Sequence, residues 1–240
     1  MAVVELPDIS AHAASTSWWD ADAECTLVMS EPSADKDLWR DYLLGAARSY
    51  RKHGVEAALD VKAIQRAGDT TLFWALLDAA GRVVGGLRAV GPLRSPDDSH
   101  AVIEWAGQPG LPLVRGMIAE RVPLGVMEAK SAWVTDDPNR NRHLTTSLAR
   151  TPFHGMALLG VQFFMATSAE HALAPWRSSG GVIAPIPSTP YPDARYRTKM
   201  MWWDRLTFAD HAEPAQVPKI HAEMDDVYRR MDSRVLQHTR

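Results

Sequence analysis

The stretch 127–178 constrains the fold most strongly, because strand and helix patterns alternate along it. The pattern predicts, in order, a strand at 127–134, a polar turn at 135–141, a helix from Arg142, a strand at 161–166 and a helix at 168–178. Two strands joined through a helix lie parallel in one sheet. We therefore expect a β-α-β unit followed by a further helix.

An antiparallel hairpin is predicted upstream of this unit, where 71–77 and 83–90 are rich in β-prone residues and flank a turn ending at Gly81. Before the hairpin, a strand at 25–29 leads to a helix with Ser33 near its start. The remaining predictions are a second, weaker helix at 55–65, a short strand at 100–105 inside an irregular excursion at 91–125, late β-rich runs at 182–184 and 197–208, and a helical tail at 217–235.

A chain of 240 residues with 46% hydrophobic residues can bury the core of a single domain. The expected class is α/β: a mixed central β-sheet flanked by helices, with a C-terminal helical tail. We divide the chain into a loosely ordered segment (1–24), the main domain (25–208) and the tail (209–240). The apolar spacing of the tail suits either a homodimer contact or packing on its own domain.

Composition excludes several classes of function. The single cysteine, Cys25, cannot form an internal disulfide, and the first residues lack a secretory signal, so a cytoplasmic location is expected. A net charge of −3 with dispersed basic residues argues against nucleic-acid binding, and no apolar run is long enough to span a membrane. Histidines at metal-ligand spacing, a nucleophile elbow and a phosphate-binding Gly-Lys-Ser/Thr loop are absent from the sequence, so we expect no metal.

Three motifs, in this order of elements, resemble the GNAT acyltransferase superfamily. The hairpin segment 81–88 is similar to the second and third strands of that family and of acyl-homoserine-lactone synthases. Arg140-Asn141-Arg142-His143-Leu144-Thr145 occupies the place of the pyrophosphate loop, Arg-Gly-x-Gly-x-Gly, with the Arg and Leu but without the glycines. The segment 172–180 resembles the Ala-x-x-x-Tyr-x-x-x-Gly pattern, with Trp176 at the Tyr position.

The resemblance implies a binding site for a phosphopantetheine thioester. It places backbone groups of Ala132, Trp133 and Val134 along the pantetheine arm, and it places Arg140, Asn141, Arg142, His143, Leu144 and Thr145 around the phosphates at a helix start. The bulk of His143 raises the alternative that the donor is an acyl carrier protein rather than acyl-CoA. The other interpretation is an ordinary solvated turn before a helix.

A carboxylate is expected to act as the general base, because an amine must lose a proton before it attacks a thioester. Glu128 resembles the Glu of the matching strand in acyl-homoserine-lactone and long-chain N-acyl amino acid synthases and is our first choice; Glu104 is the second. A strand-edge ion pair of Glu128 with Lys130 or with an arginine is the alternative interpretation. Trp176 cannot serve as an acid near neutral pH, so His171 donates the proton or the thiolate leaves unassisted.

These features predict an N-acyltransferase that moves an acyl group from acyl-CoA or an acyl carrier protein to a small amine. A non-catalytic GNAT-shaped module that binds an acyl carrier or a protein partner is the alternative. The tryptophans expected on strands suit either an acyl channel or the core: Trp74, Trp105, Trp133 and Trp202.

Overall fold

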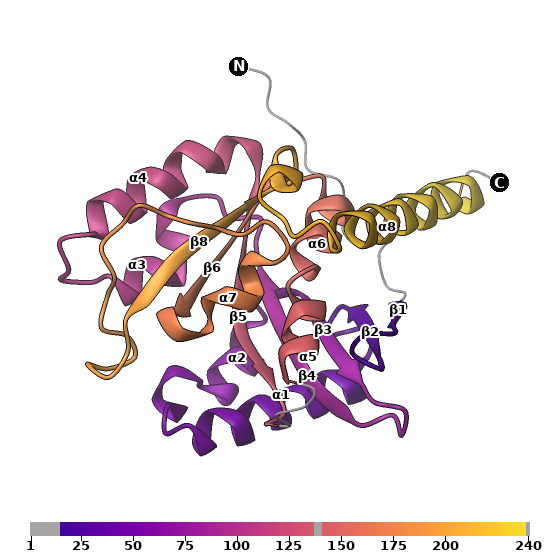
Figure 1. Cartoon of the computed structure of the whole chain (residues 1–240), viewed down its shortest axis with the longest axis horizontal. Coiled ribbons are helices and arrows are strands. Elements are labelled where there is room, and N and C mark those ends of the chain that lie inside the picture. The colour runs from indigo at the N-terminus through magenta and orange to yellow at the C-terminus, as the bar shows by residue number, and fades with distance from the viewer. Residues whose placement is uncertain (1–14, 137–140, 239–240) are drawn as a thin grey trace.

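A mixed eight-stranded sheet forms the centre of the molecule (Figure 1). The computed structural model describes residues 15–136 and 141–238. The strand order is β1-β2-β3-β4-β5-β6-β8-β7, and every neighbouring pair is antiparallel except β5 and β6. The strands are β1 (Thr16–Asp20), β2 (Cys25–Ser30), β3 (Thr70–Leu77), β4 (Val83–Val90), β5 (Val126–Val134), β6 (Phe163–Ala169), β7 (Val182–Ile183) and β8 (Thr198–Asp204).

Helices cover both faces of this sheet. They are α1 (Lys36–Lys52), α2 (Val61–Ala67), α3 (His100–Glu104), α4 (Leu111–Arg121), α5 (Asn141–Leu148), α6 (Thr151–Leu159), α7 (Leu173–Arg177) and α8 (Val217–His238). On one face, α5, α6, α7 and α8 share a core with the strands. On the other face, α1 and α2 cover the half containing β3, whereas α3 and α4 cover the half containing β6 and β8. The second face is therefore divided into two separately packed halves.

Strands β5 and β6 separate after a short paired stretch, which opens the sheet at its centre. Their parallel pairing extends only from Val126 opposite Phe163 to Glu128 opposite Met165. Farther along, β5 stays paired with β4, and β6 stays paired with β8. A bulge lies in β5, where Ser131 has a φ of +55° and the register with β4 shifts. The strands thus diverge beside an irregularity in the backbone.

Trp133 of β5 packs against α1 rather than filling this opening. The indole lies directly on Gly45, where an added Cβ would stand 2.0 Å from Cζ2 of Trp133. Gly45→Ala is expected to lower the free energy of unfolding by about 1–3 kcal/mol, because overpacking a closed contact outweighs the gain in helix propensity. Denaturant unfolding measures the change.

The matched control is Gly116→Ala on the exposed side of α4. A Cβ at Gly116 meets nothing within 4 Å, so this variant should gain up to about 1 kcal/mol from helix propensity. If both variants gained stability, the indole would not be fixed against Gly45. Opposite signs for the two glycines would confirm the close approach.

Most of the elements expected from the sequence are confirmed. The hairpin 71–77/83–90 is β3 and β4, the strand 127–134 is β5, and the apolar stripe after Ser33 is α1, whose N-cap is Asp35. The helix expected from Arg142 breaks into α5 and α6, with Pro152 in the first turn of α6, where a missing N–H is tolerated. The mixed α/β class is confirmed.

Two local predictions are wrong. Residues 100–105 do not form a strand, because His100–Glu104 is helix α3 and Trp105 is its C-cap. The segment 1–24 is not loose over its described part, because Thr16–Asp20 forms edge strand β1 paired with β2. Trp74, Trp105 and Trp202 lie in the hydrophobic core, so they do not line a channel.

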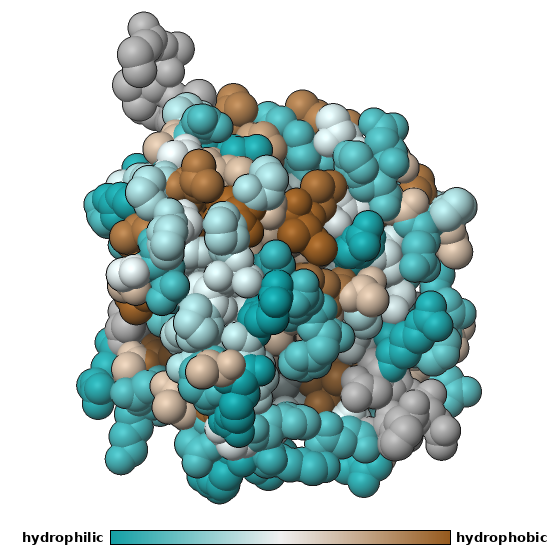
Figure 2. Space-filling view, turned by 60° about the vertical axis from the view of Figure 1, so that its left-hand side comes forward, coloured by the Kyte–Doolittle hydropathy of each residue, from teal (hydrophilic) through white to brown (hydrophobic). Residues whose placement is uncertain are grey.

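Helix α8 packs on its own domain. Ile220, Met224 and Val227 are buried in the core that α8 shares with α6. The apolar side of α8 is thus used within the chain, and we propose no dimer through it. On the face shown in Figure 2, hydrophobic residues lie in separate groups among hydrophilic ones. Across the described residues, the helices are all too short or too polar to cross a lipid bilayer.

A buried ionic network also fixes α8 to the sheet; its members are Arg150, Asp20, Glu223 and His154. Arg150 Nη2 lies 2.6 Å from Asp20 Oδ2, and Arg150 Nε donates to Glu223 Oε1 at 2.9 Å. His154 Nε2 lies 2.8 Å from Glu223 Oε2, and the His154 ring stacks on Trp18. The network therefore ties β1, the start of α6 and α8 together.

Candidate active site

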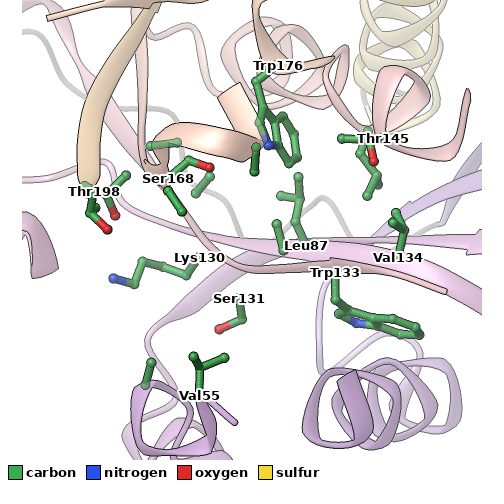
Figure 3. Close-up of a pocket in the computed structure, with 18 of the residues that line it drawn as sticks. Val55, Leu87, Lys130, Ser131, Trp133, Val134, Thr145, Ser168, Trp176 and Thr198 are labelled. Carbon is green, nitrogen blue, oxygen red and sulfur yellow. The ribbon is translucent and has the colours of Figure 1, made fainter. Parts of the chain in front are cut away.

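A cavity of about 660 Å³ occupies the opening between β5 and β6 (Figure 3). It reaches both faces of the sheet, because its walls include Leu148 and Phe164 from one side and Tyr50 and Glu104 from the other. Its size is that of a site for a small molecule or a cofactor. In Figure 3, Lys130 points toward Thr198 at one end, and Thr145 and Val134 lie at the other.

Glu104 is a deeply buried carboxylate in the cavity wall. Helix α3 positions it, and that helix begins where the Ser99 side chain accepts the N–H of Ala101. The Glu104 side chain is 4% exposed, Oε1 accepts a 2.9 Å hydrogen bond from Thr167, and Oε2 is buried without a hydrogen-bond partner. Burial raises the pKa of Glu104 to about 7. Such a group exchanges protons near neutral pH.

Glu128, our first choice from the sequence, is fully buried and is not part of the cavity wall. Its Oε2 accepts the backbone N–H of His100 at 3.0 Å, so it caps the start of α3. The ion pair considered as an alternative is present, since Lys130 Nζ lies 3.6 Å from Glu128 Oε1. Glu128 therefore supports the helix that carries Glu104.

Five side chains line one end of the cavity, which we call the amine end after the role that we propose for it: Tyr50, His100, Glu104, Lys130 and Tyr191. Lys130 Nζ is 3.8 Å from Glu104 Oε1, and His100 Nε2 is 3.0 Å from the Tyr191 hydroxyl. Burial, together with the charges of Lys130 and Arg88, lowers the pKa of His100 to about 4. At neutral pH this histidine is therefore uncharged.

At the opposite end, the start of α5 faces the cavity. Arg142 and Thr145 belong to the wall, whereas Leu144 is buried in the core and His143 is exposed outside the wall. Asn141 begins α5, and the prediction for Arg140 lies outside the described residues. Among the predicted loop residues whose side chains are described, 142–145, the structure thus brings Arg142 and Thr145 to the cavity.

The other predicted site residues also border the cavity: Ala132, Trp133, Val134, His171 and Trp176. Trp176 stands over the centre of the cavity in Figure 3, and the Trp133 ring points away toward the helices. His171 is exposed and lies against Tyr196, with ring centroids 6.2 Å apart. Within the described chain, no group of three or more His, Cys, Asp or Glu side chains is placed to hold a metal ion.

Sequence reasoning missed most of the amine end. His100 and Glu104 stand four residues apart, a spacing that places them on one face of a helix, but the strand prediction for 100–105 hid that signal. The sequence suggests Lys130 only as an ion-pair partner of Glu128, although alternation along a strand puts both side chains on the same face. For Tyr50 and Tyr191 we find no local signal.

The fold of this chain matches solved acyltransferase structures. The acyl-homoserine lactone synthase BjaI, solved with SAM and isopentyl-CoA, superposes with a TM-score of 0.52 at 15% identity, covering 81% of this chain and 85% of that one. FeeM, an N-acyl amino acid synthase from uncultured soil microbes, gives a TM-score of 0.52 at 12% identity, covering 85% and 99%. The chain therefore has the GNAT fold, as its motifs implied.

Close relatives in sequence come from mycobacteria. Rv1356c of Mycobacterium tuberculosis (strain H37Rv) and Mb1391c of Mycobacterium bovis are each 56% identical over 218 residues, covering 90% of this chain and 83% of theirs. The chain belongs to the same family as these mycobacterial proteins, both of which are described as uncharacterized. The sequence matches no protein-family model.

Proposed function

We propose that this protein is an N-acyltransferase that moves an acyl group from a phosphopantetheine thioester to a small amine, with Glu104 as general base. The observation that carries the proposal is a buried carboxylate with one unpartnered oxygen, in the wall of a cavity where two parallel strands separate. A base works best when its pKa lies near the operating pH, and the pKa of Glu104, about 7, meets that condition.

In this proposal, the acyl donor lies along the β5 side of the opening. The pantetheine arm runs past Ala132, Trp133 and Val134, whose neighbour Ser131 marks the bulge. The phosphate end meets the start of α5, where backbone N–H groups, the helix dipole and Arg142 all favour an anion. These features suit either acyl-CoA or an acyl carrier protein, because both donors carry a phosphate.

The reaction proceeds by proton removal and then acyl transfer. Glu104 takes one proton from the substrate ammonium, which frees the nitrogen lone pair. The nitrogen attacks the thioester carbonyl, so a C–N bond forms and the C–S bond breaks. The second nitrogen proton is lost as the amide forms, and it balances the charge of the departing thiolate. The products are one amide and one free thiol.

Protonation of the thiolate does not require Trp176. An indole N–H is not acidic near neutral pH, although Trp176 borders the cavity and can pack on the pantetheine arm. His171 also borders the cavity and is exposed, so it can exchange a proton between solvent and the leaving group. The thiolate is a much better leaving group than an amine, so we assign His171 a supporting role.

Calorimetric titration with acetyl-, octanoyl- and palmitoyl-coenzyme A tests the donor site. At least one is expected to bind, and Arg142→Ala should weaken that binding roughly tenfold through loss of a charge-assisted contact to phosphate. The control is Arg40→Ala on α1, because Arg40 does not border the cavity and pairs with Asp37 at the surface.

A thiol-release assay with the acyl-CoA that binds distinguishes the enzyme from the binding module. Release of free thiol when an amine is added to the protein with its acyl-CoA supports the enzyme. Binding of acyl-CoA without thiol release from any amine would instead favour the module. Failure of all three coenzyme A esters to bind would exclude coenzyme A as donor and leave the carrier protein to be tried.

A further inference from the structure

We propose that the acceptor is a cationic amine that carries no carboxylate beside its amino group. This inference rests on the proposed function and specifies the substrate class for the amine end. The argument depends on the charges that line this end, on their mutual distances and on their burial. An amino acid brings a carboxylate close to any site that binds its α-amino group, so the site must provide a partner for that negative charge.

Lys130, the ammonium group at the amine end, already lies beside two carboxylates. Lys130 Nζ lies 3.8 Å from Glu104 Oε1 and 3.6 Å from Glu128 Oε1, and its side chain is only 13% exposed. Both carboxylates are buried, and each keeps one oxygen without a hydrogen-bond partner. Two carboxylates beside one ammonium leave an excess of negative charge when both are ionised. This arrangement attracts a second ammonium and repels a carboxylate.

The neighbouring guanidinium is engaged as well. Arg88 stands opposite Lys130 across β4 and β5, and its Nη1 lies 3.0 Å from Asp69 Oδ1 and 3.0 Å from Thr70 Oγ1. Its side chain is 7% exposed, and it does not border the cavity. To bind a substrate carboxylate, Lys130 would have to leave a buried carboxylate unpaired, which is costly. Arg88 would have to leave Asp69 and enter a cavity that it does not border.

The remaining walls of the amine end suit a cation. Tyr50 and Tyr191 both border the cavity, and the charge of Glu104 acts on both phenols. Burial, followed by the charge of Glu104, raises the pKa of both phenols, so they remain neutral. Neutral phenol rings beside a carboxylate form favourable surroundings for an ammonium group. The uncharged His100, hydrogen-bonded to Tyr191, adds no competing positive charge.

Matched amines test the proposal directly. Tyramine is compared with tyrosine, and agmatine with arginine, using octanoyl-coenzyme A and detection of both free thiol and the acylated product by mass. The amine of each pair is expected to have at least about a tenfold higher kcat/KM, because its partner places a carboxylate against an excess of negative charge. A higher kcat/KM for the amino acids would overturn the inference while leaving the proposed acyltransferase intact.

Glu128→Gln provides the second readout. Removing this charge leaves Lys130 with Glu104 alone, so the preference for the amine over the amino acid should shrink. An unchanged ratio in a variant with native thermal stability would overturn the inference that excess negative charge at this end excludes amino acids.

Binding without turnover keeps the two proposals separate. If octanoyl-coenzyme A binds and no compound is acylated, the proposed function fails and the binding module is favoured. The substrate class is then judged by thermal shift of the protein with coenzyme A and each compound alone. A larger shift with the amine of each pair supports the inference, and a larger shift with the amino acid overturns it.

Discussion

Glu104→Gln should acylate amines about 100- to 10,000-fold more slowly than the native protein, with a smaller change in KM. Glutamine keeps the size of the side chain and can still accept the hydrogen bond from Thr167, but it cannot take a proton. The loss should therefore appear in kcat. Steady-state thiol release with a saturating acyl donor measures it.

The pH profile provides a signature that a merely structural role would not produce. Burial raises the pKa of Glu104 to about 7, so the active ionised form accumulates as pH rises through that value. The rate should increase with pH through about 7, and Glu104→Gln should lose this limb. Thr167→Val removes a hydrogen bond to Oε1 that stabilises the ionised form, so its profile should move to higher pH.

Glu128→Gln is the matched control, because it makes the same isosteric change at a carboxylate outside the cavity wall. Its amide oxygen can still accept the N–H of His100 and keep the start of α3. We expect this variant to keep the pH-dependent limb and to lose far less kcat than Glu104→Gln. If Glu128→Gln abolished the limb and Glu104→Gln retained it, the roles assigned to the two carboxylates would be reversed.

The fold could be predicted where local patterns decide the structure. The hairpin of β3 and β4 and the stripe on α1 follow from periodicity alone. Helix α3 could not be predicted in this way, because one of its caps is the Glu128 carboxylate from another strand. Strand β1 likewise depends on pairing with β2 and on the stack of Trp18 over His154. Contacts between distant residues overrode local propensity in both cases.

The sequence predicted which elements border the site, but not which carboxylate faces the cavity. The family resemblance directed attention to β5 and the start of α5, and both border the cavity. Which carboxylate faces the cavity depends on the tertiary arrangement, since Glu104 and Thr167 are 63 residues apart in the chain. The sequence contains Glu104, Glu128 and Lys130 but does not show that one ammonium lies near both carboxylates.

The largest effect on stability is expected at Arg150. Its side chain is 2% exposed, and it contacts Asp20 at the end of β1 and both Gln216 and Glu223 at the start of α8. Arg150→Ala leaves two buried carboxylates without their guanidinium partner, and removing one partner of a buried pair typically costs about 3–5 kcal/mol. Urea unfolding at about pH 7 measures the loss, and the surface variant Arg40→Ala should change stability by less than about 1 kcal/mol.

Acid should reduce the difference between the native protein and Arg150→Ala. Burial alone would raise the pKa of Asp20 and Glu223. Arg150 instead lowers the pKa of Asp20, and His154 followed by Arg150 lowers the pKa of Glu223, so both values lie below their ordinary range. A carboxyl group with a lowered pKa stabilises the fold fully above its unfolded pKa and loses that contribution as pH falls through its folded pKa. The stability difference should thus be largest near neutral pH and shrink in acid. A difference that stayed constant, or that never exceeded the Arg40→Ala control, would show that β1 and α8 are held by apolar packing alone.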